Sequence, residues 1–349
     1  MTETIKSDIR RLSKEALETL MKENNFPRYR ADQIWEWVWT KQRVTFDQFK
    51  NLPKELIAFL DTNFTILPVT IDKVQKSIDG TIKSRMKLFD DHLVESVLIP
   101  VRNDKRYTVC VSSQVGCSLS CTFCATGQMK RMRNLDASEI YDQVALVNKQ
   151  CLETYKHPLT NIVYMGMGEP LLNYANVLQS IEHISSPKGL GMSPRRITVS
   201  TVGIAKMIRK LAEDKVRFNL ALSLHAANDV KRTTIMPINE QNNLATLMEA
   251  LTFFYQTTGN RISYEYIAFA GFNDSLEDAE DLLNLCKSFP VRVNIIEYNN
   301  VSGVNFEKSK ASSIQLFAKY LTKKGVMVTV RRSRGKDIDA ACGQLANKG

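Results

Sequence analysis

The sequence lacks the features that would place a protein in a membrane or in a secretory pathway. No apolar run approaches the length of a bilayer-spanning helix, and the first residues are polar and charged, without the apolar stretch of a secretory signal. We therefore expect a cytoplasmic protein with no membrane contact. In such a reducing compartment, the seven cysteines are not expected to form structural disulfides.

Acidic residues are also in short supply. The chain has 47 Lys and Arg against 37 Asp and Glu, for a net charge of +10. This excess favours a polyanionic partner but does not identify one. With 349 residues, of which 44% are hydrophobic, the chain can bury a full core and still carry an accessory domain.

The N-terminal part, to about residue 75, has apolar residues at helical spacing, and we predict that it is helical. All three tryptophans lie at positions 35, 37 and 39, and Trp35 and Trp39 share a helix face. A helix core is the simpler interpretation of this pair; stacking on RNA bases is the alternative. Next come two β-prone runs, Lys83–Phe89 and Leu93–Pro100, whose connection resembles a hairpin turn.

After the hairpin, strand and helix patterns alternate six times. A capping-box pattern at Asp136 and Glu139 marks the start of the first helix. This alternation predicts an α/β fold with a parallel sheet rolled into a partial (βα)6 barrel, and an open doubly wound sheet is the competing topology. We predict three parts: a helical RNA-binding accessory domain, a β-hairpin extension, and a core with a C-terminal catalytic segment (residues 1–78, 79–104 and 105–349). The predicted strands are 107–113, 161–165, 196–200, 217–222, 261–269, 291–296 and 326–332, and the predicted helices after 136 are 174–185, 204–214, 244–256, 276–288 and 314–324.

Three cysteines, Cys117, Cys121 and Cys124, lie in one loop directly after a predicted strand. Structural zinc usually takes four protein ligands in two pairs, and this loop has no second pair. A [4Fe–4S] cluster on three thiolates keeps one iron free of protein ligands. That iron can chelate the amino and carboxylate groups of S-adenosylmethionine, and an electron from the cluster then breaks a C–S bond to give a 5′-deoxyadenosyl radical. The spacing is the motif of the radical S-adenosylmethionine (radical SAM) superfamily.

Polar residues follow several predicted strands at the end where a βα barrel binds its ligands. The loop after strand 161–165 contains Gly168 and Glu169, which suit close backbone approach and the binding of an ammonium group. Five further residues lie at or just after the ends of other predicted strands, namely Ser200, Ser223, Leu224, His225 and Asn299. Each of them alone would be interpreted as a turn or cap residue, but together they favour a ligand-binding lining.

Two further cysteines stand apart from this loop. Cys342 precedes a glycine near the C-terminus, and Cys110 lies within the first core strand, on one face with Ser112. From their positions alone, each reads as a small buried hydrophobe or an idle thiol.

Five stretches, in order and at compatible separations, resemble the RlmN/Cfr family of radical SAM RNA adenine methyltransferases. The resemblance runs from about residue 15 to the C-terminus and includes a small helical N-terminal domain. The stretches are Cys110 to Cys117, Met165 to Asn173, Ser193 to Thr201, Leu222 to Ala226 and Asp337 to Leu345.

The resemblance implies roles for these residues. Cys342 would carry a methyl group, Cys110 would resolve the intermediate, and Glu95 matches a proton acceptor. Met165 matches a methionine near the cluster. The S-adenosylmethionine site would comprise Gly168, Glu169, Ser200, Ser223, Leu224, His225 and Asn299.

The resemblance also implies a mechanism that uses two S-adenosylmethionine molecules per turnover. The first methylates Cys342, and the second supplies the radical that activates this methyl group for addition to adenine. Glu95 or Cys110 would take the ring proton; the sequence leaves both open. Attack by Cys110 then frees the product and leaves a Cys110–Cys342 disulfide, which needs reduction.

The implied reaction is C2 methylation of adenine in 23S rRNA, at the peptidyl transferase centre, and in tRNA, 3′ to the anticodon. C8 methylation of the same rRNA adenine, an antibiotic-resistance activity, is the alternative, and the Gly168–Asn173 loop resembles the C2 branch. An alternative from a different functional class is a zinc- or cluster-stabilised RNA-binding module without catalytic activity. We expect a monomer that draws electrons from a reductant protein. Basic clusters at 130–133, 195–196 and 331–334 are the predicted RNA contacts.

Overall fold

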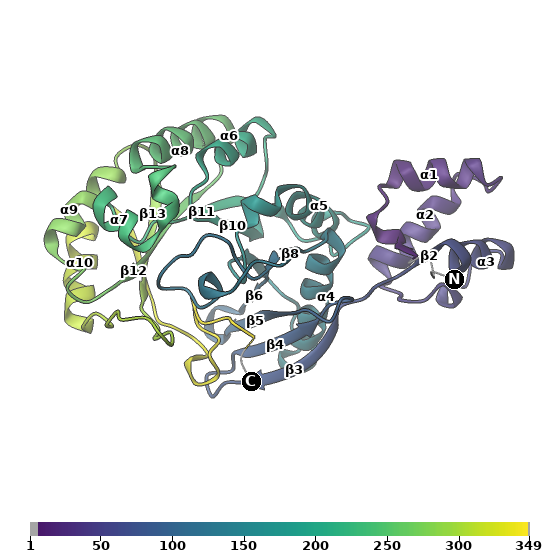
Figure 1. Ribbon diagram of the computed structural model, residues 1–349, viewed down its shortest axis with the longest axis horizontal. Helices are drawn as coiled ribbons and strands as arrows, with labels where there is room; N and C mark the ends of the chain where they lie inside the picture. Colours follow the sequence, from purple (N-terminus) through teal and green to yellow (C-terminus); the bar gives the residue numbers. More distant parts are fainter. Residues whose placement is uncertain (1–5, 348–349) are drawn as a thin grey trace.

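The N-terminal domain is a small helical unit that stands to one side of the barrel in the computed structural model, which describes residues 6–347 (Figure 1). Its helices are α1 (Lys14–Glu23), α2 (Arg30–Trp35), a following π-helical turn (Glu36–Thr40) and α3 (Lys54–Asn63). Two short parallel strands, β1 (Ser7–Asp8) and β2 (Phe64–Thr65), join its two ends. Ser13 caps α1 by accepting a hydrogen bond from the Ala16 amide.

Two of the tryptophans are buried in this domain, which supports the helix-core interpretation. Trp37 and Trp39 are 8% and 1% exposed, and Trp35 packs on Trp39 with ring centroids 5.8 Å apart. Trp39 also stacks on His183 of the core, with centroids 3.9 Å apart. A buried ion pair between Arg10 and Asp142, 2.8 Å apart, adds a second link. The domain therefore packs on the core through apolar and charged contacts.

Three antiparallel strands connect this domain to the barrel: β3 (Thr70–Lys76), β4 (Ile82–Lys87) and β5 (Leu93–Val101). The predicted hairpin is β4–β5. Residues 70–75 were predicted to be helical, and this prediction was wrong: they belong to strand β3. Its β-branched residues favour a strand, and its lysines suit the exposed edge of a sheet.

The sheet continues from β5 into seven parallel strands whose spatial order follows the chain. They are β6 (Arg106–Cys110), β9 (Asn161–Tyr164), β10 (Ile197–Thr201), β11 (Asn219–Ser223), β12 (Ile262–Ala268), β13 (Val291–Glu297) and β14 (Met327–Arg331). A doubly wound sheet would reverse its strand order at a switch point, and this one does not. The two outer strands of the ten, β3 and β14, do not pair in the described part of the chain, so the barrel is open.

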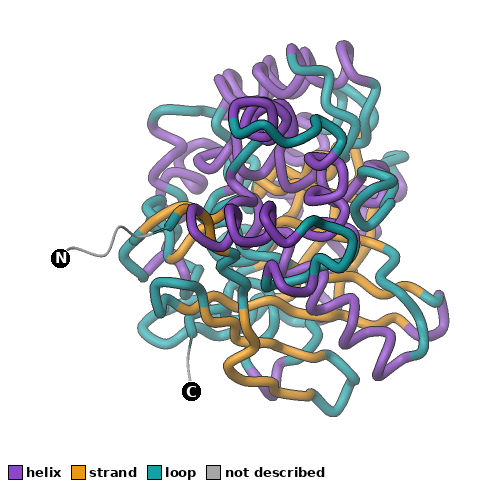
Figure 2. The backbone as a smooth tube through the Cα atoms, turned by 90° about the vertical axis from the view of Figure 1, so that its right-hand side faces the viewer, coloured by secondary structure: helices purple, strands orange, loops and turns teal. Residues whose placement is uncertain are grey.

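Helices pack on the outside of the strands, as the rotated view in Figure 2 also shows. The capping box predicted at Asp136 and Glu139 is present and starts α4. One helix, α7, was missed because it is only two turns long. None of the described helices combines the length and apolar character that a membrane crossing requires. The core helices are α4 (Ala137–Tyr155), α5 (Tyr174–Ser185), α6 (Ala205–Glu213), α7 (Asp229–Ile235), α8 (Leu244–Thr258), α9 (Leu276–Leu285) and α10 (Ala311–Lys323).

Candidate active site

The loop with three cysteines is pinned at both of its ends. Strand β7 (Gln114–Val115) before it pairs antiparallel with β8 (Arg133–Asn134) after it. Gly116 enters the loop with φ +75°, and a Cβ atom there would lie 2.1 Å from the Lys130 carbonyl oxygen. Only glycine fits this crossing of the two loop ends.

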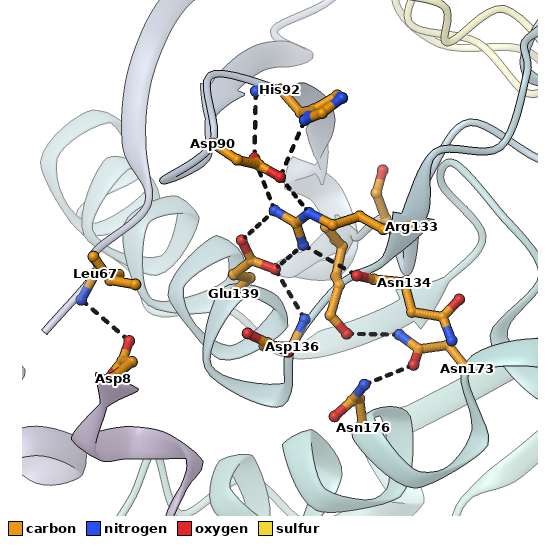
Figure 3. A network of polar contacts seen from close by, with 12 residues as sticks. Asp8, Leu67, Asp90, His92, Arg133, Asn134, Asp136, Glu139, Asn173 and Asn176 are labelled. Atoms are coloured by element: carbon orange, nitrogen blue, oxygen red, sulfur yellow. Dashed lines mark hydrogen bonds and ion pairs between the residues drawn. The ribbon is translucent and has the colours of Figure 1, made fainter. Parts of the chain in front are cut away.

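Arg133 fixes the end of this loop to the start of α4 (Figure 3). Its guanidinium lies 2.5 Å from Asp90 and 2.7 Å from Glu139. Glu139 is also the carboxylate of the α4 capping box. The basic cluster at 130–133 was predicted to contact RNA, and for Arg133 the structure instead shows an internal ion-pair network.

The three loop cysteines open onto one cavity with the residues at the strand ends. In the described part of the chain, no group of three or more His, Cys, Asp or Glu side chains is arranged to hold a single metal ion. Predicted residues that line the cavity are Cys117, Cys121, Cys124, Met165, Gly168, Glu169, Ser200, Ser223, His225 and Cys342.

Glu169 is a carboxylate in an almost fully buried position, 2% exposed. It accepts hydrogen bonds from the Leu171 amide at 3.0 Å and from the Val202 amide at 2.9 Å. Burial raises the pKa of Glu169 to about 7, although both amide bonds favour its charged form. A buried carboxylate without a cationic partner is suited to bind an ammonium group, which would restore its charge balance.

The backbone around Glu169 is shaped for close approach. Gly168 has φ +92°, and a Cβ atom there would lie 2.4 Å from the Gln114 Cβ. The Gln114 side chain accepts a hydrogen bond from the Glu169 amide at 2.8 Å. The first core strand and the loop after the second are therefore locked together next to the cysteines.

His225, Ser200 and Ser223 form a further part of the cavity wall. The hydroxyls of Ser200 and Ser223 lie 3.3 Å apart. His225 Nδ1 accepts a hydrogen bond from the Ile267 amide at 3.1 Å, and its ring meets Phe123 of the cysteine loop at 4.7 Å. Burial and the nearby Arg232 lower the pKa of His225 to about 3, so its ring is neutral at physiological pH.

Sequence reasoning missed Arg232, which organises these strand ends. Its fully buried guanidinium donates to the carbonyl oxygens of Val202, Ser223 and Leu224, and to the Asn239 side chain. One side chain thus joins the ends of β10 and β11. The only sequence signal was an arginine in a short helix, and this is indistinguishable from a surface residue.

Two of the residues predicted to bind S-adenosylmethionine, Leu224 and Asn299, are not among those that line the cavity, and neither is Cys110. Leu224 is fully buried, and its carbonyl accepts from Arg232 at 3.1 Å. Asn299 donates to the Cys342 carbonyl at 3.4 Å. The structure thus places Asn299 beside the C-terminal segment that carries Cys342.

This C-terminal segment covers the cysteine loop. The Ala125 amide donates to the Gly343 carbonyl at 2.8 Å, and the Thr126 hydroxyl donates to the Leu345 carbonyl at 2.6 Å. Farther along, the segment passes close to β4 and β5 (Figure 1). The Cys342 side chain is exposed and faces the cavity, next to the loop with three cysteines.

Glu95 is buried on β5 and anchors the end of the same segment. Its Oε2 accepts from the amides of Ala346 and Asn347, at 3.0 and 3.2 Å. Its Oε1 lies 3.2 Å from the Lys83 ammonium group. Glu95 is not among the residues that line the cavity.

The two separate cysteines share one cationic neighbour, Arg331. Burial and a negative charge on Cys342 together raise the pKa of Cys110 to about 12, and Arg331 opposes this rise. Burial also raises the pKa of Cys342, and Arg331 again opposes the rise. Arg331 pairs with Glu265 at 3.1 Å. Sequence reasoning assigned Arg331 to an RNA-binding cluster and overlooked Glu265.

Two family models match the chain. The radical SAM superfamily model matches residues 111–286, and the model of the ribosomal RNA large subunit methyltransferase N-terminal domain matches residues 7–66. A crystal structure of a radical SAM methyltransferase from Sphaerobacter thermophilus superposes with a TM-score of 0.91 at 38% identity, over 98% of this chain and 100% of that one. The predicted radical SAM fold is therefore confirmed.

Similar curated proteins extend over nearly the whole chain. A probable dual-specificity RNA methyltransferase RlmN of Cytophaga hutchinsonii is 54% identical over 347 residues, covering 99% of this chain and 94% of that protein. A dual-specificity RNA methyltransferase RlmN of Nautilia profundicola is 39% identical, covering 95% of this chain and 96% of that protein.

Proposed function

Because this chain belongs to the RlmN family of radical SAM RNA methyltransferases, we propose that it methylates C2 of adenine in RNA through a methyl group carried on Cys342. The observation that carries this proposal is the position of Cys342. Its thiol faces the cavity that the three loop cysteines line, and a negative charge on Cys342 raises the pKa of Cys110. A methyl transferase that acted by simple displacement would need neither thiol.

The residues present fit a [4Fe–4S] cluster and S-adenosylmethionine. Cys117, Cys121 and Cys124 would hold the cluster, which supplies the electron that cleaves S-adenosylmethionine. Glu169, a buried carboxylate without a cationic partner, would bind the amino group of this substrate. The strand-end residues Gly168, Ser200, Ser223 and His225, which line the cavity, would complete the proposed site together with Leu224 and Asn299, which lie just behind its wall.

Cys342 would take part in both halves of the reaction. After loss of its proton, which Arg331 favours, Cys342 would accept a methyl group from a first S-adenosylmethionine. A second S-adenosylmethionine provides the radical that removes a hydrogen atom from this methyl group. The carbon radical adds to the adenine ring, and RNA is then bound covalently through Cys342.

Cys110 and Glu95 would complete the turnover. One of them would take the proton from the ring carbon while the adduct radical gives up one electron, for which the cluster would be the acceptor. The Cys110 thiolate would then attack the Cys342 sulfur and break its bond to the methylene carbon, which takes up a proton to become the methyl group of the released RNA. The resulting disulfide is reduced again by a thiol donor, and an electron-transfer protein reduces the cluster. Both thiols are free in the structure, so the disulfide is an intermediate in this proposal and not a structural bond.

We propose 23S rRNA, at the peptidyl transferase centre, and tRNA, 3′ to the anticodon, as substrates. The dual specificity in the names of the relatives supports this pair. The N-terminal domain (residues 1–78) would contact RNA, because its family model is described as a ribosomal RNA methyltransferase domain. We also propose that residues 79–104 form a hairpin extension and residues 105–349 a core. We propose a monomeric protein with a cytoplasmic location.

One experiment tests the proposal directly. The protein is purified anaerobically, its iron and sulfide are measured, and it is incubated with S-adenosylmethionine, a reductant and an anticodon stem-loop RNA. We expect 5′-deoxyadenosine and an RNA with one added methyl group, located at adenine C2 by mass spectrometry of the nucleosides. A methyl group at C8 would support the antibiotic-resistance reaction instead, and zinc without iron would refute both.

A further inference from the structure

The interior of the barrel continues beyond the cysteine cavity toward the opposite end of the sheet. A second cavity is lined by residues of β5, β6 and β9 to β14. Met165, Glu265 and Arg331 line both cavities, so the two meet at these side chains. We call the two cavities together the inner passage: it extends from the starts of the strands to the cysteine cavity, and the Glu265–Arg331 ion pair lies where the two cavities meet.

This passage has a basic opening at the starts of the strands. Arg106 is the first residue of β6, Arg196 and Arg261 immediately precede β10 and β12, and Arg292 is the second residue of β13. We call these four arginines the arginine mouth. The cavity lining contains five arginines and one carboxylate, Glu265.

The charge of the arginine mouth is not balanced by the protein. Glu265 is already engaged by Arg331 at 3.1 Å and by Asn294 at 2.7 Å. The guanidinium groups of Arg106, Arg196 and Arg261 are on exposed residues and make no ion pair with any other residue that the structure describes. Several like charges around one opening repel each other and attract a polyanion. Arginine is also the side chain best suited to hold phosphates in two-pronged hydrogen bonds.

The C-terminal segment lies at the other end of the barrel. There the C-terminal segment lies across the cysteine loop, with the Ala125–Gly343 and Thr126–Leu345 hydrogen bonds described above. A large substrate that entered from that side would have to displace this segment, which also carries Cys342. The starts of the strands offer an approach that leaves Cys342 in place.

We propose that the arginine mouth binds the phosphates of a single-stranded RNA segment, and that the target adenine enters the barrel through it. This inference rests on the proposed function and adds the direction of entry. The inner passage is lined midway by the short polar side chains of Thr108, Thr198 and Ser263, which admit a flat base. A base must leave its stack to enter, so a loop or single strand is bound in preference to a duplex.

The test compares RNA binding by the cluster-loaded protein and two matched triple variants. In the mouth variant, Arg106, Arg196 and Arg261 are all replaced by glutamine. In the control variant, three exposed lysines on the outer helices α6 and α10, Lys206, Lys319 and Lys323, are replaced by glutamine. Both variants lose the same charge. Fluorescence anisotropy with a labelled anticodon stem-loop RNA gives Kd as a function of salt concentration.

We expect the mouth variant to bind at least tenfold more weakly than the wild-type protein, on the order of what a loss of three phosphate contacts causes near 0.1 M salt. Its slope of log Kd against log salt concentration should fall by about 2, because single strands lose about 0.7 for each contact. Methylation of Cys342 without RNA, measured by mass spectrometry, should stay at the wild-type level in both variants. The control variant should bind RNA as the wild type does.

An unchanged slope in the mouth variant, or equal weakening in both variants, would overturn the inference. Equal affinity of the wild type for a fully paired duplex would overturn it as well. In each of these cases the wild-type protein still methylates RNA, and the proposed function stands. A wild-type protein that neither binds nor methylates RNA would instead refute the proposed function.

Discussion

Lys83 and Glu95 form an ion pair at 3.2 Å in which both side chains are almost fully buried, 3% and 1% exposed. Glu95 uses its second oxygen to hold the amides of Ala346 and Asn347. The Lys83 ammonium also lies 3.4 Å from the Asp339 carbonyl. This single pair therefore connects the β4–β5 hairpin to both flanks of the segment that carries Cys342.

Removal of one partner of this pair should destabilise the protein strongly. We expect Glu95→Gln to lower the free energy of unfolding by about 3–5 kcal/mol, because Lys83 would keep an uncompensated buried charge. Denaturant unfolding measures this. As a control, Asp91→Asn breaks the exposed Lys87–Asp91 pair and should cost no more than about 1 kcal/mol.

A double substitution separates the anchoring of the segment from proton transfer. With Lys83→Met and Glu95→Gln together, no buried charge is left and the amides of Ala346 and Asn347 keep an oxygen acceptor, so stability should return to within about 2 kcal/mol of the wild type. If Glu95 accepts the ring proton, RNA methylation by this variant falls on the order of 10²-fold while Cys342 is still methylated. Methylation of RNA at the wild-type rate would assign the proton to Cys110.

Substitution of Cys110 should stop the reaction after RNA has become attached. We expect Cys110→Ala to accumulate a covalent protein–RNA adduct, because no thiol remains to attack the Cys342 sulfur. Denaturing gel electrophoresis detects the adduct, and nuclease treatment removes the shift. Cys286→Ala, which changes a cysteine at the end of α9, should give normal turnover. Clean turnover by Cys110→Ala would contradict the assigned role.

Glu169 should make the cluster-free protein less stable as the pH rises. Burial raises the pKa of Glu169 to about 7, from a usual value near 4.5. Between these pH values the folded protein holds a proton that the unfolded chain has lost, so the free energy of unfolding falls with rising pH, by up to about 3 kcal/mol. Glu169→Gln should remove this dependence, at the constant cost of about one hydrogen bond. Parallel pH profiles for the two proteins would refute the prediction.

His183 should produce the opposite dependence. Burial against Trp39 lowers the pKa of His183 to about 4, and its Nε2 atom has no hydrogen-bond partner in the structure. The unfolded chain binds a proton below about pH 6.5 that the folded protein excludes until about pH 4, so stability is lost as the pH falls through this range. The loss amounts to at most about 3 kcal/mol.

The variant His183→Phe should weaken this acid sensitivity because its ring can stack on Trp39 without titrating. Thermal unfolding between pH 4 and 7 measures the difference from the wild type. His157→Gln, at a half-buried position away from Trp39, is the control and should leave the profile unchanged. The same slope in the wild type and in His183→Phe would exclude His183 as the cause.

Much of the barrel could be predicted from the sequence, because its signals are local. The predicted helix 174–185 has the bounds of α5, and the capping box at Asp136 starts α4 as expected. Hydrophobic periodicity and end signals lie within one element and need no partner. Strand β3 was mistaken for helix because an edge strand is half exposed and is defined by its pairing with β4.

The candidate site also contains residues that local sequence signals identify and residues whose roles depend on tertiary contacts. The sequence by itself was enough to predict the three cysteines of the loop, Glu169 and the polar strand ends as one site, because their residue types and spacing suit that chemistry. Only the tertiary structure decided that Arg331 faces both Cys110 and Cys342, that Arg232 joins two strand ends, and that four arginines meet around one opening. These residues are far apart in the chain, and a lone arginine has no local pattern to show whether it is buried, paired or free. Its role depends on which other elements the fold brings to it.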